Sequence, residues 1–275
     1  MVILIQCKDQ VGLVAAISAV LAKKEINIVS MREHVDTKDN RFFARLVVVG
    51  QYEQLSLEEA LRNILPADAT IKVNPQPEKK VVVLVTKDYH CLGDILIRNH
   101  FKTLGATVQA VIGNHVDLKD LCDRFNVPFH YVWHEQIDKS IFESIIKDHI
   151  NNYLPDYLVL AKFMRILSES FVEQFAEQII NIHHSFLPAF VGANPYRQAY
   201  ERGVKLIGAT AHFVTNQLDE GPIIAQQIIP VNHSFTSADM VRSGKEIETA
   251  VLARALQLVF EDRVLIYKNK TIVFD

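Results

Sequence analysis

Residues 75–86, Pro-Gln-Pro-Glu-Lys-Lys-Val-Val-Val-Leu-Val-Thr, divide this chain into two parts of different character. The first half of the stretch is polar and contains two prolines, a composition typical of a linker between domains. The second half is a continuous aliphatic run, which is typical of a strand buried on both faces of a parallel sheet. We therefore predict a small domain over residues 1–75, a linker over 76–80 and a larger α/β domain over 81–275.

The residues before the linker predict a ferredoxin-like βαββαβ unit, in which short apolar runs alternate with stretches of helical periodicity. Asp9 follows the first run and is a candidate N-cap for the first helix. The expected elements are, in order, a strand over 2–7, a helix through 24, strands over 27–34 and 41–49, a helix over 57–65 and a strand over 69–73.

After the linker, buried-strand patterns alternate with helical ones, which predicts a Rossmann-like, mostly parallel sheet covered by helices on both faces. The expected strands are 80–86, 106–113, 128–133, 157–161, 179–183, 205–215 and 223–231. The expected helices are 90–104, 116–125, 138–153, 168–176, 196–202 and 237–261, followed by a hairpin over 264–274.

The composition narrows the classes of partner. The 275 residues are 49% hydrophobic and 22% charged, with 29 Lys and Arg against 32 Asp and Glu, so a broad basic surface for nucleic acid is not expected. The three cysteines, Cys7, Cys91 and Cys122, form no CxxC pair and are expected to be free thiols in a reducing compartment. The N-terminus lacks a basic region and no apolar run is long enough for a bilayer, so we expect a cytoplasmic protein without membrane contact.

Several phosphate-binding and catalytic motifs are missing. The sequence contains no GxGxxG after a strand, no P-loop, no GxSxG and no HExxH. The first strand-to-helix junction of the larger domain, residues 87–93, has bulky side chains and a single glycine, so its backbone could not easily wrap a phosphate. Nucleotide-dependent dehydrogenases and P-loop NTPases are therefore disfavoured.

The polar residues Asn181 and His183 lie in an apolar strand pattern. Because side chains alternate along a strand, both point to the same side, at the carboxyl end where open parallel sheets bind ligands. An amide donor beside an imidazole suits a reaction that develops negative charge on a carbonyl oxygen. The alternative is a buried Asn–His hydrogen bond with a purely structural role.

A second polar cluster, residues 217–222, contains Asp219 between two predicted strands. By itself it is a turn, but a carboxylate near an imidazole can orient the ring or hold a reacting water. His212 on the preceding strand either lines the same cleft or packs in the core. His183, His184, His212 and His233 have no metal-ligand spacing, so no catalytic metal is expected.

Together these motifs resemble the folate-dependent formyltransferase family. The resemblance covers residues 80–275 and is carried by Asn181-Ile-His183, Ser185-Phe-Leu-Pro188, Leu218-Asp-Glu-Gly-Pro222 and Leu160-Ala-Lys-Phe-Met-Arg-Ile-Leu-Ser168. The run from Asn181 to His212 is similar to the deformylases of this family, which hydrolyse 10-formyltetrahydrofolate to tetrahydrofolate and formate. Residues 1–75 resemble an ACT domain, through Asp9-Gln-Val-Gly-Leu13 in the first loop.

The resemblance implies specific roles. Asn181, His183 and Asp219 would be the catalytic trio, and Met164, Arg165, Ile166, Leu167 and His212 would bind the folate substrate, with no cofactor. Asn181 would donate to the oxyanion, His183 would stabilise it and move protons to the leaving nitrogen, and Asp219 would polarise His183 and position the water. The enzyme would supply formate for purine biosynthesis and balance the one-carbon folate pools.

The alternative within the family is a transferase that passes the formyl group to an amine, as glycinamide ribonucleotide transformylases do. Those enzymes have a glycine-rich phosphate-binding loop after the first strand, where this chain has the crowded residues 87–93. Water is then the expected acceptor. The ACT resemblance implies an amino-acid effector near Asp9, Gln10, Val11, Gly12 and Leu13 and a homo-oligomer, the alternative being a unit that serves assembly alone.

Overall fold

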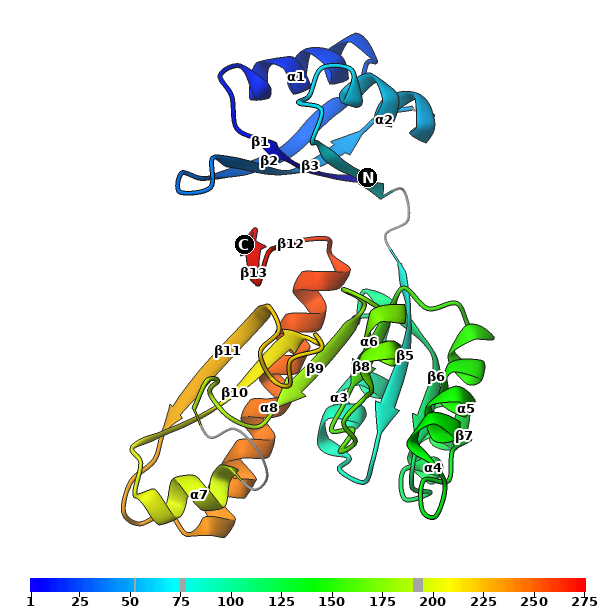
Figure 1. Cartoon of the computed structure of the whole chain (residues 1–275), viewed down its shortest axis with the longest axis vertical. Helices are drawn as coiled ribbons and strands as arrows, with labels where there is room; N and C mark the ends of the chain where they lie inside the picture. The colour runs from blue at the N-terminus through cyan, green and yellow to red at the C-terminus, as the bar shows by residue number, and fades with distance from the viewer. Residues whose placement is uncertain (52, 75–77, 190–194) are drawn as a thin grey trace. The chain divides into compact units, whose positions relative to one another are not determined.

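The computed structural model describes residues 1–51, 53–74, 78–189 and 195–275 (Figure 1). Its contacts divide the chain into two compact units. The first contains residues 1–77 together with 261–265 and 272–275, and the second contains residues 78–260 together with 266–271. The aliphatic stretch that follows the prolines therefore opens the second unit, while the last residues of the chain belong mostly to the first.

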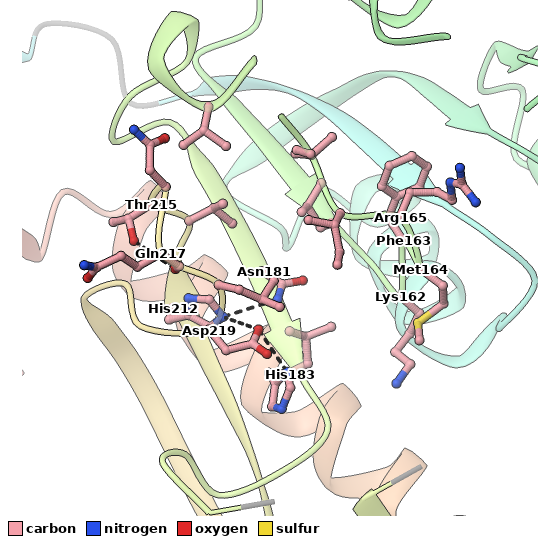
Figure 2. Close-up of a pocket in the computed structure, with 18 of the residues that line it drawn as sticks. Lys162, Phe163, Met164, Arg165, Asn181, His183, His212, Thr215, Gln217 and Asp219 are labelled. Atoms are coloured by element: carbon pink, nitrogen blue, oxygen red, sulfur yellow. Dashed lines mark hydrogen bonds and ion pairs between the residues drawn. The ribbon is translucent and has the colours of Figure 1, made fainter. Parts of the chain in front are cut away.

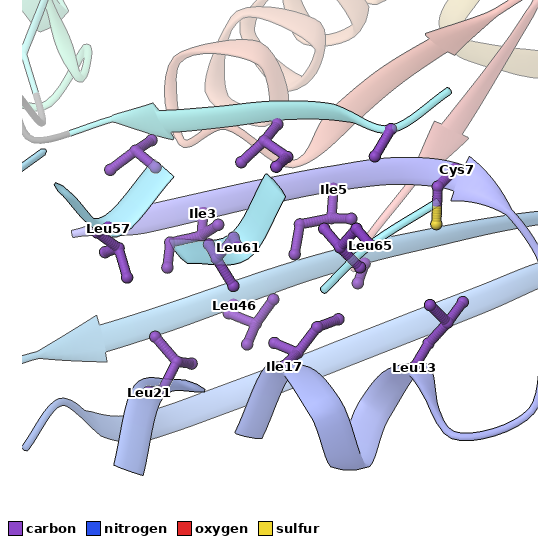
Figure 3. Close-up of a cluster of buried hydrophobic side chains, with 14 of the residues drawn as sticks. Ile3, Ile5, Cys7, Leu13, Ile17, Leu21, Leu46, Leu57, Leu61 and Leu65 are labelled. Atoms are coloured by element: carbon purple, nitrogen blue, oxygen red, sulfur yellow. The ribbon is translucent and has the colours of Figure 1, made fainter. Parts of the chain in front are cut away.

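The first unit has the predicted βαββαβ order. Its elements are β1 (Val2–Lys8), α1 (Leu13–Lys23), β2 (Asn27–Asp36), β3 (Arg41–Val49), α2 (Gln54–Arg62) and β4 (Thr70–Asn74). The strands form an antiparallel sheet in the order β2-β3-β1-β4. Alternate residues of β1 and β3, such as Ile3, Ile5 and Leu46, point to one face and pack against Ile17 of α1 and Leu61 of α2 (Figure 3).

The predicted N-cap at Asp9 is wrong. Helix α1 begins at Leu13, after Gly12 at φ 93°. The amide of Asp9, just after the end of β1, instead donates to the carbonyl of Asn40 at 2.9 Å. The chain reverses through the left-handed conformation of Gly12, which a glycine adopts at little cost, and Val11 is fully exposed at the turn.

The second unit contains a seven-stranded sheet in the order β11-β10-β9-β8-β5-β6-β7. The strands are β5 (Lys79–Val85), β6 (Ala106–Gly113), β7 (Phe129–Tyr131), β8 (Tyr157–Leu160), β9 (Ile179–His183), β10 (Leu206–Phe213) and β11 (Ile223–Pro230). All neighbours from β9 to β7 pair in parallel, and β10 runs antiparallel to both β9 and β11. The prediction of a mostly parallel sheet is confirmed, and the reversal at β10 was not predicted.

Helices cover both faces of this sheet. They are α3 (His90–His100), α4 (Lys119–Arg124), α5 (Lys139–Asn151), α6 (Glu169–Gln174), α7 (Pro195–Arg202) and α8 (Ser237–Phe260). Val82 and Leu84 of β5 pack in one core with residues of α5 and α6, while α3 and α8 pack against each other, and α8 packs on β9, β10 and β11. Within the described part of the chain, no helix is both long and apolar enough to cross a bilayer.

The end of the chain forms the predicted hairpin, β12 (Val264–Tyr267) and β13 (Lys270–Val273). The guanidinium of Arg45 in β3 donates to the carbonyls of Glu261 at 2.9 Å and Asp262 at 2.8 Å. These bonds lie within the first unit and attach the residues after α8 to the antiparallel sheet.

The order of the parallel strands fixes where a ligand binds. From β5 the chain moves first to β6 and β7 on one side, and then to β8 and β9 on the other. Loops leaving the carboxyl ends of β5 and β8 therefore diverge and leave a crevice, the usual ligand site of open α/β sheets. Residue 162 lies just beyond the end of β8, and His183 is the last residue of β9.

Candidate active site

A pocket of about 300 Å³ lies next to the ends of β8 and β9, on the side of the sheet toward β10 (Figure 2). Its lining comes from the segment after β8, the end of β9, the end of β10 and the loop between β10 and β11. Among the lining residues are those that the sequence singled out: Met164, Arg165, Ile166, Leu167, Asn181, His183, His212 and Asp219. The tertiary structure therefore brings together residues that are far apart in the sequence.

His183 and Asp219 form a buried pair in the pocket. The Nδ1 of His183 lies 3.2 Å from Oδ1 of Asp219, and the two side chains are 7% and 10% exposed. A carboxylate at Nδ1 holds the ring proton there and leaves the lone pair on Nε2. Nε2 is buried and has no hydrogen-bond partner among the described residues, so an oriented imidazole presents a free nitrogen at this site.

Asn181 is oriented by a second chain of hydrogen bonds. Its amide nitrogen donates to Nε2 of His212 at 3.2 Å, and Nδ1 of His212 donates to the carbonyl of Phe213 at 2.8 Å. Both ring nitrogens of His212 are thus engaged, which makes this side chain a support for Asn181. One proton of the Asn181 amide remains for another acceptor.

The pKa shifts of Asp219 and His212 favour an ionised carboxylate and a neutral His212 ring. Burial raises the pKa of Asp219, but the hydrogen bond from His183 and the charge of that ring outweigh it, and the pKa is lowered from its usual value. Burial lowers the pKa of His212. At neutral pH the pocket therefore contains a carboxylate and an uncharged His212.

The loop between β10 and β11 sets the position of Asp219. Asp219 has a left-handed backbone at φ 59°. Two residues later, a Cβ added to Gly221 would lie 1.8 Å from the carbonyl oxygen of Phe213, so only glycine fits there. The amide of Phe213 donates to the carbonyl of Pro222 at 2.9 Å and closes the loop. The Asp-x-Gly-Pro spacing is therefore a steric requirement of this turn.

The segment after β8 forms the apolar wall of the pocket. Met164 and Ile166 are 56% and 65% exposed, and the amide of Met164 donates to Oγ1 of Thr86 at 2.9 Å. Exposed apolar side chains that face a concave surface are typical of a ligand site. An aromatic ligand could lie against this wall with its reacting group next to Asn181, His183 and Asp219.

The five residues predicted to bind an effector lie elsewhere, in the first unit. Asp9, Gln10 and Val11 are on the turn before α1, Gly12 is the N-cap residue, and Leu13 is buried in the core of that unit. Gly12 and Leu13 can therefore contact a ligand only through their backbone, whereas the side chains of Gln10 and Val11 are exposed.

A buried polar cluster beside the pocket was missed by the sequence analysis. Glu248 of α8 is 1% exposed and interacts with His90 Nε2 at 2.8 Å, Tyr196 Oη at 2.7 Å and Lys162 Nζ at 3.1 Å. His184, which follows the catalytic candidate His183, stacks on that ring with centroids 5.1 Å apart. These residues come from five separate segments, and no local motif joins them. In the sequence, this cluster is indicated only by Lys162 and Glu248, two charged residues that interrupt apolar patterns.

His90, Cys91 and Glu248 are close enough to be tested as metal ligands. The Glu248 oxygens already accept from His90, Tyr196 and Lys162, and burial raises the pKa of Cys91 far above its usual value. A metal ion would have to displace the Lys162 ammonium and deprotonate the thiol. The donor set therefore suits hydrogen bonding better than metal coordination.

Comparisons with known proteins identify the families that the two parts of the chain match. Residues 79–256 match the formyl transferase family, and residues 1–65 match the ACT domain. A formyltetrahydrofolate deformylase of Haemophilus influenzae is 46% identical over 272 residues, which are 99% of this chain and 98% of that protein.

Two solved structures differ in how similar they are to this chain. A formyltetrahydrofolate deformylase from Pseudomonas syringae pv. tomato has a TM-score of 0.94 at 39% identity, covering 100% of this chain and 94% of that one. A glycinamide ribonucleotide transformylase from Symbiobacterium toebii has a TM-score of 0.69 at 30% identity, covering 72% of this chain and 95% of that one. The transformylase is thus the more distant relative.

Proposed function

The chain belongs to the formyltetrahydrofolate deformylase family, and from that premise we propose that its pocket hydrolyses 10-formyltetrahydrofolate to tetrahydrofolate and formate. The formate then serves purine biosynthesis, and the reaction balances the one-carbon folate pools. The observation that carries the assignment of the site is the buried Nε2 of His183, which has no hydrogen-bond partner in the described part of the chain and whose ring is oriented by Asp219.

In the proposed mechanism, the pterin lies against Met164 to Leu167 and the formyl group reaches the polar end of the pocket. A water attacks the formyl carbon, and Nε2 of His183 takes its proton. Asp219 stabilises the imidazolium that forms, through its bond to Nδ1. General-base contributions of this kind are typically on the order of 10²–10⁴-fold in rate.

The attack places negative charge on the formyl oxygen. The Asn181 amide proton that His212 does not use is proposed to donate to this oxyanion. Loss of such a donor typically costs about 2.7–4 kcal/mol of transition-state stabilisation. The tetrahedral intermediate then collapses as His183 returns the proton to the folate nitrogen, which leaves formate and tetrahydrofolate.

The alternative is transfer of the formyl group to an amine. It is favoured only by the fold shared with the transformylase, and fold alone does not define the acceptor. The junction between β5 and α3 opposes a phosphate-bearing acceptor, because the bulky Tyr89 precedes α3, and Cys91 and Leu92 in its first turn are packed into the core at 1% and 0% exposure. Water remains the acceptor that the site supports best.

The assay is release of tetrahydrofolate and formate from 10-formyltetrahydrofolate in buffer without any amine. We expect turnover by the wild type and a loss of about 10²–10⁴-fold in kcat for Asp219→Asn, because the imidazolium loses its counter-charge. Asp120→Asn, an exposed carboxylate paired with Arg124, is the matched control and should leave kcat unchanged. An Asp219→Asn enzyme that keeps most of its kcat would refute the assigned role.

The first unit is proposed to bind an amino acid near residues 9–13 and to mediate assembly into a homo-oligomer, in keeping with its match to the ACT domain. The three cysteines are buried and free, which suits a reducing compartment such as the cytoplasm, and no cofactor is assigned. Thermal-shift measurements with the set of amino acids, repeated on Gly12→Val, test the effector. A ligand that stabilises both proteins equally would place its site elsewhere.

A further inference from the structure

A second cavity adjoins the reaction pocket and has no part in the mechanism above. It has a volume of about 200 Å³ and is lined mainly by side chains of α3, α7 and α8. Lys162, Met164 and His184 line both cavities and therefore form the wall between them. With the folate against the apolar wall, this second cavity is a route by which an acceptor could reach the formyl carbon.

Lys162 occupies this wall at a conformational cost. Its backbone is left-handed, with φ 63°, a region that non-glycine residues adopt only under constraint. The side chain is nevertheless buried, at 8% exposure. A glycine would adopt this backbone at less cost, and it would leave the space of the side chain empty.

The Lys162 ammonium is fixed by the carboxylate of Glu248, 3.1 Å away. Hydrogen bonds from His90 and Tyr196 hold that carboxylate in turn. The Tyr196 ring fits because residue 244 of α8 is glycine, where an added Cβ would lie 2.2 Å from the ring. Side chains from α3, α7 and α8 thus fix the position of the Lys162 ammonium.

This cluster is continuous with the catalytic residues. His184 stacks on His183 with centroids 5.1 Å apart and lies against Tyr196 at 6.1 Å. Burial, and then the charge of Lys162, lower the pKa of His184 to about 4, so this ring is neutral at working pH. The wall between the cavities therefore contains one ammonium group, which is paired with the Glu248 carboxylate, beside the reaction site.

An amine acceptor must pass this wall, whereas water need not. An amine is larger than water and meets the Lys162 side chain, which the ion pair with Glu248 holds in place. The transformylase has the same domain fold and takes an amine, so the choice of acceptor must come from side chains around the reacting carbon.

We propose that Lys162, held by Glu248, is the specificity-determining residue that restricts the acceptor to water. The inference rests on the proposed hydrolysis of 10-formyltetrahydrofolate and explains why that reaction excludes amines. Removal of the Lys162 side chain should join the two cavities and admit a small amine.

The test uses glycinamide as the probe amine and the full-length chain. In the transfer reaction, the amine nitrogen bonds to the formyl carbon, the bond from that carbon to the folate nitrogen breaks, and the folate nitrogen takes up the proton that the amine loses. The products are N-formylglycinamide and tetrahydrofolate. Mass spectrometry gives the ratio of N-formylglycinamide to formate for each variant.

We expect the wild type to yield formate alone and Lys162→Gly to raise the ratio at least about tenfold, the scale on which pocket contacts change substrate discrimination. Lys102→Gly is the matched control, because Lys102 is also left-handed, at φ 59°, but is exposed and lines neither cavity. In Lys162→Gly, the buried Glu248 carboxylate loses its ammonium partner, which can prevent folding. If so, the double variant Lys162→Gly/Glu248→Gln, which lacks this buried charge, is measured in its place.

The outcomes separate the two proposals. A wild type that hydrolyses the substrate, with folded Lys162 variants that still give formate alone, overturns the role of Lys162 and leaves the hydrolase intact. A rise in the ratio for Lys102→Gly equal to that for Lys162→Gly overturns it as well. A wild type that releases no formate without an amine refutes the proposed function itself.

Discussion

At the scale of single residues, the site depends on groups whose conformation or charge is costly by itself. Lys162 and Asp219 both have left-handed backbones, and each places a charge at the pocket. Glu248 is almost completely buried, yet its pKa is lowered to about 2: burial raises it, but the hydrogen bond from His90, the charge of Lys162 and the hydrogen bond from Tyr196 outweigh that effect. These residues persist because their neighbours compensate the cost.

The Glu248 carboxylate makes stability depend on pH. Its folded pKa lies below the ordinary value of 4.5, so the unfolded chain binds the proton first as the pH falls. The stabilisation, about 3 kcal/mol in magnitude, is fully present above pH 4.5 and is lost as the pH falls towards 2. Urea unfolding over this range should show the loss for the wild type and a flatter profile for Glu248→Gln.

The control for this experiment is Glu58→Gln. Glu58 forms an exposed ion pair with Arg62 on α2, and such pairs contribute little. Its pH profile should therefore match that of the wild type. If Glu248→Gln also keeps the wild-type slope below pH 4.5, the carboxylate does not carry the acid sensitivity.

At the scale of elements, helix α8 is shaped by the ring that packs on it. Gly244 lies inside a 24-residue helix, where glycine costs about 1 kcal/mol relative to alanine. The Tyr196 ring occupies the space that a Cβ would need. Gly244 therefore lowers the intrinsic stability of α8, but it leaves room for the Tyr196 ring of α7, whose hydroxyl donates to Glu248.

We expect Gly244→Ala to lower the free energy of unfolding despite the higher helix propensity of alanine, because the new Cβ would overlap the Tyr196 ring. In a Tyr196→Ala background the same substitution should stabilise by up to about 1 kcal/mol. Urea unfolding of the four proteins gives the coupling energy.

Gly93→Ala is the matched substitution in α3, since a Cβ there meets nothing within 4 Å. Gly93→Ala should therefore raise the free energy of unfolding without any second substitution. Equal effects of alanine at positions 93 and 244 would show that the Tyr196 ring does not determine the glycine in α8.

At the scale of the whole molecule, the two ends of the chain belong to one compact unit. Residues 261–265 and 272–275 group with the antiparallel sheet of the first unit, and Arg45 donates to the carbonyls of Glu261 and Asp262. The first unit is therefore completed by residues that follow α8, the helix that carries Glu248.

Arg45→Met should weaken this attachment. Two hydrogen bonds from a charged donor are lost, for a cost of about 1–3 kcal/mol, and the amides of residues 261–263 should exchange faster with solvent. Arg62→Met, on an exposed side chain, is the control and should leave exchange at these amides unchanged. Unaltered exchange in Arg45→Met would show that the attachment rests on other contacts.

Much of the fold was predictable because it follows from local patterns. The continuous aliphatic run of β5 and the alternation along β9 define buried parallel strands, and the latter places Asn181 and His183 on one side. The first helix was placed too early, because a candidate cap at Asp9 was preferred to the turn at Gly12. The reversed strand β10 also escaped prediction, since strand direction depends on the connections that the chain makes in space.

Local sequence was enough to predict the order of most strands and helices and to select Asn181, His183 and Asp219 as candidates, since periodicity, spacing and motif resemblance are properties of local sequence. Only the tertiary structure decided that Asp219 orients His183, that His212 supports Asn181, and that His90 and Lys162 meet the distant Glu248. The reason is physical: a buried charge is compensated by whichever groups the packing brings near it, and no local pattern records that choice.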